Sequence, residues 1–132
     1  MNYLEIDDSS PIPIYEQIMD GIQRFVREGT LVPGALLPSV RQLASDLEIN
    51  PNTVAKAYSL LEKDGIIETA RRRGTRISEA ASSRSHQSLT DRADAAADRL
   101  IRETAHLELS ADDLVSALVR RLKTPAAKRK PS

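Results

Sequence analysis

Three consecutive arginines, Arg71 to Arg73, stand near the middle of the chain, and Arg76 follows them with no acidic residue in between. Neighbouring like charges repel one another, and a bound anion relieves that repulsion. Such a run suits a polyanion with closely spaced phosphates, such as the backbone of double-stranded DNA. A solvated charged turn explains the same residues, and the surrounding elements make us favour phosphate binding.

A second polar group precedes these arginines. Asparagine can pair with adenine through two hydrogen bonds, and lysine can reach guanine or a phosphate. Taken singly, each residue has an ordinary explanation, since Asn50 can cap a helix and Lys56 can be solvated. Together, at the start of one helix, they offer the donors and acceptors that base edges require. The group consists of Asn50, Asn52, Thr53 and Lys56.

The helix that carries this group has several start signals. Asn50 is placed as its N-cap, Pro51 occupies the first helical position, and Ile49 and Val54 have the spacing of a hydrophobic staple. Gly65 can adopt the left-handed conformation that ends a helix. The sequence therefore predicts a helix that begins after Asn50 and ends before Gly65.

A shorter helix is expected just before it. Ser39 is a suitable N-cap, and Gln42 completes the pattern of a capping box. The residues around Glu48 and Ile49 leave room only for a tight turn between the two helices. Arg41 projects from the early part of this helix, so we expect it to contact a phosphate or a base edge, with a surface salt bridge as the alternative.

Two β-prone runs follow, residues 66–69 and 75–77, and the segment from Arg71 to Gly74 predicts the tip of a hairpin between them. Upstream, apolar residues at three- and four-residue steps predict a first helix over residues 13–28. Two helices joined by a tight turn and followed by a hairpin form a winged helix-turn-helix, whose second helix enters the major groove of DNA. The expected fold class is thus mostly α with a small β-hairpin.

The C-terminal part contains two further amphipathic segments. Residues 78–87 lack apolar periodicity and predict a flexible connector or an uncapped helix extension. Helices are expected over about residues 89–101 and 114–122, and Ser110 with Asp113 caps the second. A two-helix appendage of this size cannot bury both apolar stripes on itself, so a second copy of the chain is the expected partner. Whether a small-molecule effector binds among these helices is an open question.

The expected domains follow from these elements. Residues 1–78 form the winged helix-turn-helix, residues 79–123 form the helical dimerisation region, and residues 124–132 form a basic, disordered tail.

The composition narrows the function further, because the chain has 132 residues and no cysteine. It therefore lacks disulfides, thiolate metal sites and cysteine nucleophiles. Acidic residues near the N-terminus and the lack of a long apolar run favour a cytoplasmic protein that neither enters nor spans a membrane.

One pattern typical of enzymes needs weighing. Glu103 and His106 are three positions apart in a predicted helix, as in half of a carboxylate-bridged two-metal site. The further carboxylates would have to come from Asp94 and Asp98, and a solvated helix face explains all four residues more simply. We therefore expect no metal, no cofactor and no catalytic residue.

Several short motifs also recur in a known family. They are Pro13 to Ile18, Pro33-Gly34, Leu37-Pro38-Ser39, Arg41 to Ala44, Asn50 to Val54, Ala57-Tyr58, Leu61, Gly65 and Arg73-Gly74-Thr75. Through them, residues 10–77 resemble the GntR family of transcriptional regulators. The short helical remainder is similar, in size and helical pattern only, to the YtrA-like subfamily, whose members pair through those helices.

The resemblance implies a homodimeric repressor that binds an inverted-repeat operator and controls a transporter operon. Many relatives have arginines where Pro51 and Ala55 stand here, so base recognition should shift toward Asn52, Lys56 and the hairpin. Glu48 replaces the usual glycine of the turn, and a left-handed residue there costs about 1 kcal/mol. The implied DNA contacts are Ser39, Arg41, Asn50, Asn52, Thr53, Arg71, Arg72, Arg73 and Gly74.

Two other functions fit parts of the sequence. A winged helix can serve as a docking surface for other proteins, because a fold does not determine a function. The arginines at the hairpin tip argue against such an adaptor. Some relatives fuse this domain to an aminotransferase-like enzyme, and 132 residues are too few for one.

Overall fold

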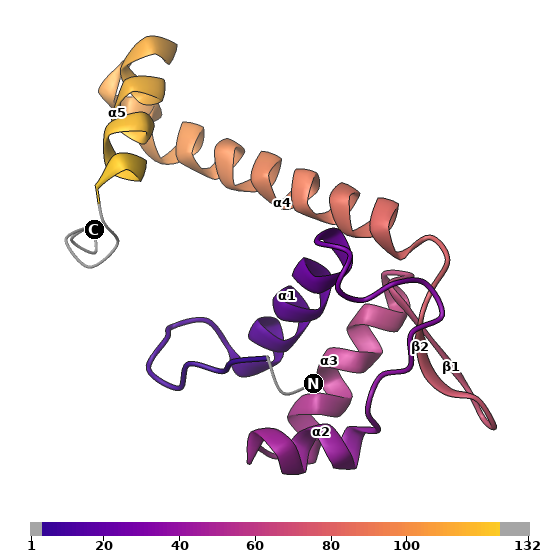
Figure 1. Ribbon diagram of the computed structural model, residues 1–132. Helices are drawn as coiled ribbons and strands as arrows, with labels where there is room; N and C mark the ends of the chain where they lie inside the picture. Colours follow the sequence, from indigo (N-terminus) through magenta and orange to yellow (C-terminus); the bar gives the residue numbers. More distant parts are fainter. Residues whose placement is uncertain (1–3, 125–132) are drawn as a thin grey trace. The chain divides into compact units, whose positions relative to one another are not determined.

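The computed structural model describes residues 4–124, which divide into two compact units, one up to Asp91 and one from Arg92 onward (Figure 1). The helix-rich architecture with one small antiparallel hairpin confirms the expected fold class. In chain order the elements are α1 (Ile14–Arg27), α2 (Val40–Leu47), α3 (Pro51–Lys63), β1 (Ile67–Ala70), β2 (Gly74–Ile77), α4 (Ala81–Thr104), the 3-10 helix η1 (Ala105–Leu107) and α5 (Ala111–Lys123).

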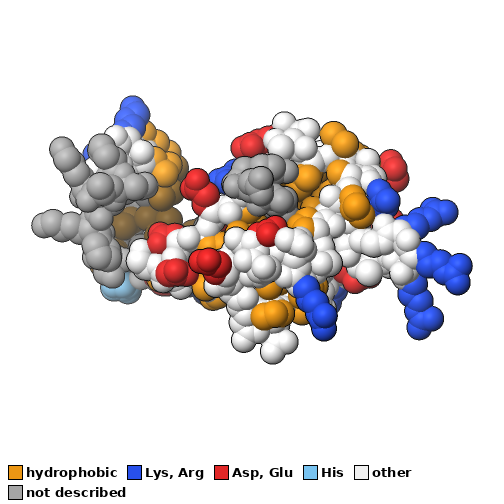
Figure 2. Space-filling model, turned by 60° about the horizontal axis from the view of Figure 1, so that its bottom comes forward, with side chains coloured by type: hydrophobic (Ala, Val, Ile, Leu, Met, Phe, Trp, Pro, Cys, Tyr) orange, Lys and Arg blue, Asp and Glu red, His pale blue; other side chains and the backbone are white. Residues whose placement is uncertain are grey.

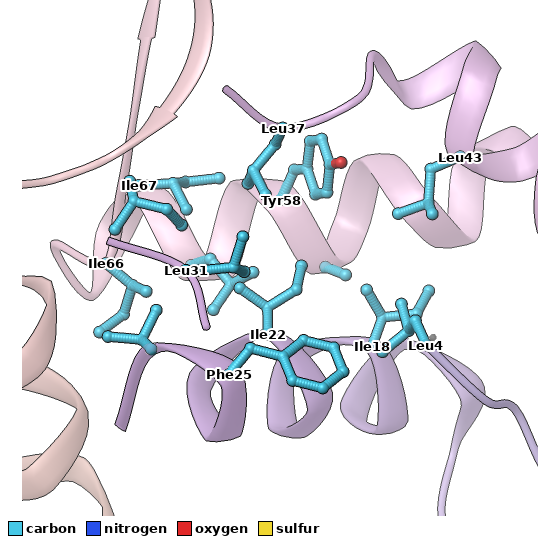
Figure 3. Close-up of a cluster of buried hydrophobic side chains, with 14 of the residues drawn as sticks. Leu4, Ile18, Ile22, Phe25, Leu31, Leu37, Leu43, Tyr58, Ile66 and Ile67 are labelled. Carbon is cyan, nitrogen blue, oxygen red and sulfur yellow. The ribbon is translucent and has the colours of Figure 1, made fainter. Parts of the chain in front are cut away.

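An apolar core in the first unit holds α3 against α1 and α2. Ile18 and Ile22 of α1 are completely buried, and Figure 3 shows them between α1 and α3. Leu43 of α2 is also completely buried and joins the same cluster. Full burial of one such side chain stabilises a fold by about 1.5–3 kcal/mol. The core therefore fixes the direction of α3, the helix that carries the polar group.

Side-chain caps begin both helices of the central pair. The Ser39 Oγ accepts a hydrogen bond from the Gln42 backbone N–H at 3.1 Å, and the Asn50 Oδ1 accepts one from the Asn52 backbone N–H at 2.8 Å. The predicted capping box at Ser39 is only half formed. The Gln42 side chain instead donates its Nε2–H to Asp46 Oδ1 at 2.7 Å, one turn further along the helix.

The turn between α2 and α3 depends on a left-handed residue. Glu48 has φ 56° and ψ 47°, which confirms the conformation expected there. The Ile49 backbone N–H then donates to the Ala44 carbonyl at 3.0 Å and closes the end of α2. Asn50 follows as the cap of α3, so only Glu48 and Ile49 stand between the end of α2 and this cap.

The β-hairpin has a third, short partner that the sequence did not predict. Strand β1 pairs with β2 from Ile67 opposite Ile77 to Ala70 opposite Gly74, and Leu36 forms a bridge to Arg76 on the other side of β2. The Leu37 backbone N–H donates to the Thr75 carbonyl at 2.8 Å. The segment before α2 is therefore bonded to the hairpin edge.

Helix α4 begins within the segment for which connector and helix extension were both considered. The structure supports the helix extension, since α4 starts at Ala81. Ala81 and Ser85 are completely buried, and the Ser85 hydroxyl accepts a hydrogen bond from Arg27 Nη1 at 2.9 Å and donates to the Gln23 carbonyl at 3.2 Å. These bonds fasten the first turns of α4 to α1. The domain boundary at residue 78 stays a prediction.

The second unit contains the rest of α4, η1 and α5. Ser110 and Asp113 form the predicted capping box at the start of α5. Hydrogen bonds from Ser110 lower the pKa of the Asp113 carboxyl. Residues 125–132 of the predicted basic tail, which include Lys128, Arg129 and Lys130, lie outside the described residues. Large apolar side chains of this unit are exposed. The exposed set is Ile101, Leu107, Leu109, Val115, Leu118, Val119 and Leu122.

Candidate nucleic-acid interface

The N-terminal turn of α3 presents polar groups to solvent. Asn52 and Lys56 are exposed, and Thr53 is half-buried. Asn50 is exposed too. Its Oδ1 already accepts the cap bond, and its amide NH2 group is available to donate. The beginning of a helix also carries backbone N–H groups and a partial positive charge, which favour an anion. This turn therefore combines base-reading and phosphate-binding chemistry.

The start of α2 adds two more of the predicted residues. Arg41 is exposed in its first turn. Ser39 is exposed as well, and although its oxygen accepts the cap bond, its hydroxyl proton can still be donated. Both residues are therefore accessible to a ligand, and their contacts with DNA stay predictions.

The tip of the hairpin carries Arg71, Arg72 and Arg73, all exposed. Within residues 4–124 their guanidinium groups have no hydrogen-bond or ion-pair partner. These side chains are therefore available to bind a ligand. Figure 2 shows basic side chains projecting at the right-hand end, where Figure 1 places the hairpin tip.

Gly74 stands beside these arginines at a position that favours glycine. Its φ of 71° is left-handed, and a Cβ atom here would lie 3.1 Å from Leu36 Cδ1. A side chain would thus be strained in its backbone and crowded by its neighbour. The exposed main chain at Gly74 leaves room for close approach of a ligand.

The polar start of α3 and the arginine tip of the hairpin lie on the same side of the first unit. In Figure 1, α2, the start of α3 and the tip of the β1–β2 hairpin all lie toward the lower side of the view. The apolar core occupies the opposite side of α3, between this helix and α1. A helix start and a hairpin tip arranged in this way suit the major groove and the flanking phosphates of one duplex.

Arg76 differs from the three tip arginines, although the sequence grouped it with them. Its Nε donates to the Arg73 carbonyl at 3.1 Å, and its Nη1 donates to the Gly34 carbonyl at 3.0 Å. The side chain is half-buried. Because Gly34 is 42 positions away, no local pattern could reveal this contact.

Tyr15 is a second residue that the sequence did not place at the site. The Lys56 Nζ lies 4.0 Å from the centroid of its ring, which is the geometry of a cation–π interaction. The first turn of α1 thus contacts the exposed face of α3. An aromatic residue near the start of α1 was the only signal in the sequence, and it equally suited the core.

The pair weighed as half of a metal site is not on one helix. Glu103 lies in α4, which ends at Thr104, and His106 lies in η1. The chain turns here, with Glu108 in the left-handed conformation, so the α-helical spacing predicted for this pair is wrong. Residues 4–124 bring together no group of three or more potential His, Cys, Asp or Glu ligands.

None of the helices within residues 4–124 has the length and apolar character of a membrane span.

Comparison with known proteins identifies relatives over the same region. Residues 14–77 match the model of the bacterial regulatory proteins of the gntR family. The HTH-type transcriptional repressor YtrA of Bacillus subtilis is 54% identical over 76 residues, which are 58% of each chain. The chain spans less than two thirds of the length of the curated relatives it matches.

Solved structures extend the likeness beyond the winged helix. A GntR family transcriptional regulator from Listeria monocytogenes is 35% identical with a TM-score of 0.67, and the match covers 87% of this chain and 98% of that one. YtrA from Sulfolobus acidocaldarius, a GntR-family transcription factor, is 38% identical with a TM-score of 0.56, covering 70% of this chain and 97% of that one. The family and subfamily resemblance is thereby confirmed, and the chain belongs to the GntR family of bacterial regulatory proteins.

Proposed function

We propose that the chain is a sequence-specific DNA-binding transcriptional regulator that acts as a repressor on an inverted-repeat operator. The observation that carries the proposal is the placement of the polar start of α3 and the arginine tip of the hairpin on one side of the winged helix. The name of the B. subtilis relative, a transcriptional repressor, supports the direction of regulation. Such a regulator acts in the cytoplasm, where the operator is.

The roles divide between phosphates and bases. Arg71 to Arg73 and Arg41 bind phosphates, and the exposed main chain at Gly74 lets the hairpin tip approach the backbone closely. Asn52 and Lys56 contact base edges in the major groove. Ser39, Asn50 and Thr53 complete the contacts next to the helix caps.

Dimerisation places two such units on the two halves of the operator. The exposed apolar residues of α4 and α5 supply the contact, since an isolated chain would leave them in water. Two copies related by a two-fold axis then fit half-sites about one helical turn apart. An effector that binds among α4 and α5 would alter this pairing and with it the simultaneous use of both half-sites. Control of a transporter operon stays a prediction from the subfamily.

Selection of bound fragments from genomic DNA tests this function. The proposal predicts that the selected fragments share a short inverted repeat, and that Asn52→Ala broadens the selected sequences more than it lowers overall affinity. Fragments with no common sequence, or capture no better than that of unrelated DNA, would contradict it. Absence of any salt-dependent DNA binding would instead favour the protein-docking adaptor.

A further inference from the structure

We propose that Arg76 is a positioning residue of the DNA-binding hairpin, which it orders by binding two backbone carbonyls rather than a phosphate. The inference rests on the proposed function, because it assigns the hairpin tip to DNA. It separates one of the four neighbouring arginines from the other three, which the charge pattern alone makes equivalent.

The side chain of Arg76 contacts both the hairpin tip and the segment that precedes α2. Its Nε donates to the carbonyl of Arg73, the last residue of the tip, at 3.1 Å. Its Nη1 donates to the carbonyl of Gly34 at 3.0 Å. The Arg73 backbone N–H also donates to the Ala70 carbonyl at 3.2 Å. The peptide groups on both sides of Arg73 are therefore engaged before any DNA arrives.

The Gly34 contact ties the hairpin to the segment that leads into α2. The Gly34 backbone N–H donates to the Ile77 carbonyl at 2.8 Å, so residue 34 is bonded to β2 through both its amide and its carbonyl. The bridge between Leu36 and Arg76 continues the same pairing. Arg76 therefore joins the hairpin tip to the chain that positions Ser39, the cap of α2.

The chemistry of the side chain suits this role. A guanidinium carries several N–H donors in a rigid planar fork, which can satisfy two carbonyls at once. Lysine keeps the charge but offers a single flexible ammonium, so it serves a phosphate well and two fixed carbonyls poorly. Because Nε and Nη1 are already occupied and the side chain is half-buried, Arg76 contributes order to the tip rather than a counterion for DNA.

The test compares Arg76→Ala and Arg76→Lys with Arg72→Ala, a matched control that removes an exposed tip arginine. Affinity for a random-sequence duplex is measured over a range of salt concentrations. Loss of order at the tip should weaken binding by Arg76→Ala about tenfold. The dependence of log affinity on log salt should stay that of the wild type, whereas Arg72→Ala should lower this slope by about one. Arg76→Lys should recover only part of the affinity.

Amide hydrogen exchange gives a readout that does not involve DNA. In Arg76→Ala the backbone amides of Gly34 and Arg73 should exchange faster than in the wild type. The Ile66 amide, which donates to the Leu61 carbonyl at the end of α3, is the internal control and should not change. Arg76→Lys keeps the comparison decisive if Arg76→Ala fails to fold.

Three results would overturn the inference. Wild-type affinity in Arg76→Ala would show that the tip needs no such support. A slope reduced as in Arg72→Ala, with full recovery by Arg76→Lys, would make Arg76 a direct phosphate contact. A wild type without salt-dependent binding would remove the proposed function itself and with it the role of the hairpin, an outcome that needs no Arg76 variant to detect.

Discussion

The Lys56 ammonium on α3 lies 4.0 Å from the centre of the Tyr15 ring on α1. An exposed lysine normally samples many rotamers, and ordering it on binding costs free energy. The ring of Tyr15 restricts Lys56 before DNA is bound. This pair thus links the first helix of the fold to the face of α3 that is proposed to contact bases.

Replacement of Tyr15 by leucine should therefore weaken operator binding. A cation–π contact at an exposed site contributes about 0.5–1 kcal/mol, which corresponds to a two- to fivefold loss of affinity. Tyr15→Phe keeps the ring and should bind like the wild type. Fluorescence anisotropy with a labelled operator checks both variants, and a Lys56→Ala background should abolish the difference between them. Equal binding by Tyr15→Leu and Tyr15→Phe would contradict the proposed role.

Glu48→Gly should stabilise the protein. Glu48 is left-handed at φ 56°, a conformation that costs a residue with a side chain about 1 kcal/mol and glycine almost nothing. Urea unfolding should show a rise of up to about 1 kcal/mol in the free energy of unfolding. The rise is limited because glycine loses more backbone entropy on folding than glutamate does. Glu48→Ala, which keeps the strain and removes the charge, is the matched control. A glycine variant less stable than the alanine variant would contradict the prediction, because the strain relieved would then be smaller than the backbone entropy that glycine loses.

Tyr58 should make stability depend on pH in the alkaline range. Its Oη donates to the Pro38 carbonyl at 2.8 Å, and burial raises the pKa of the phenol well above its ordinary value of 10.0. Since the unfolded state ionises first, stability should be constant up to about pH 10 and fall as the pH rises further. Tyr58→Phe should lose about 1 kcal/mol at neutral pH and show a smaller alkaline decline. Unfolding curves at pH 7 and pH 10.5 make the comparison, and identical declines would rule out Tyr58 as the source.

Leu118→Glu should dissociate the proposed dimer. Leu118 is 48% exposed, and it lies on α5 with Val115 and Leu122, which are 58% and 71% exposed. A carboxylate in an apolar contact leaves a desolvated charge, which is costly. Sedimentation should show a monomer for Leu118→Glu and a dimer for both the wild type and the exposed control Ser116→Glu. A wild type that sediments as a monomer, or a dimer that survives Leu118→Glu, would exclude this surface.

The sequence predicted the parts of the fold that depend on local chemistry. Ser39 and Asn50 cap their helices as expected, because a cap uses residues only two or three positions apart. Gly65 is left-handed at φ 78°, as its place after α3 requires. The polar start of α3 and the exposed arginines at the tip follow from the same local signals.

Contacts between distant segments could not be predicted from the sequence. The bond from Arg76 to Gly34 and the bridge from Leu36 to Arg76 join parts of the chain that no periodicity relates. The start of α4 could not be predicted for the same reason. A serine such as Ser85 gives no sign of burial in the sequence, and its burial follows from its hydrogen bonds to Gln23 and Arg27. Tertiary packing, rather than local propensity, decides these positions.

The salt dependence of binding to a random-sequence duplex tests the central claim most directly. Each phosphate that a cation neutralises adds about one to the slope of log affinity against log salt. If the tip of the hairpin lies on the DNA backbone, the Arg72→Ala/Arg73→Ala double variant should bind more weakly and lower the slope by about two, while Asn52→Ala leaves the slope unchanged. A double variant with the affinity and slope of the wild type would contradict the placement of the hairpin on DNA.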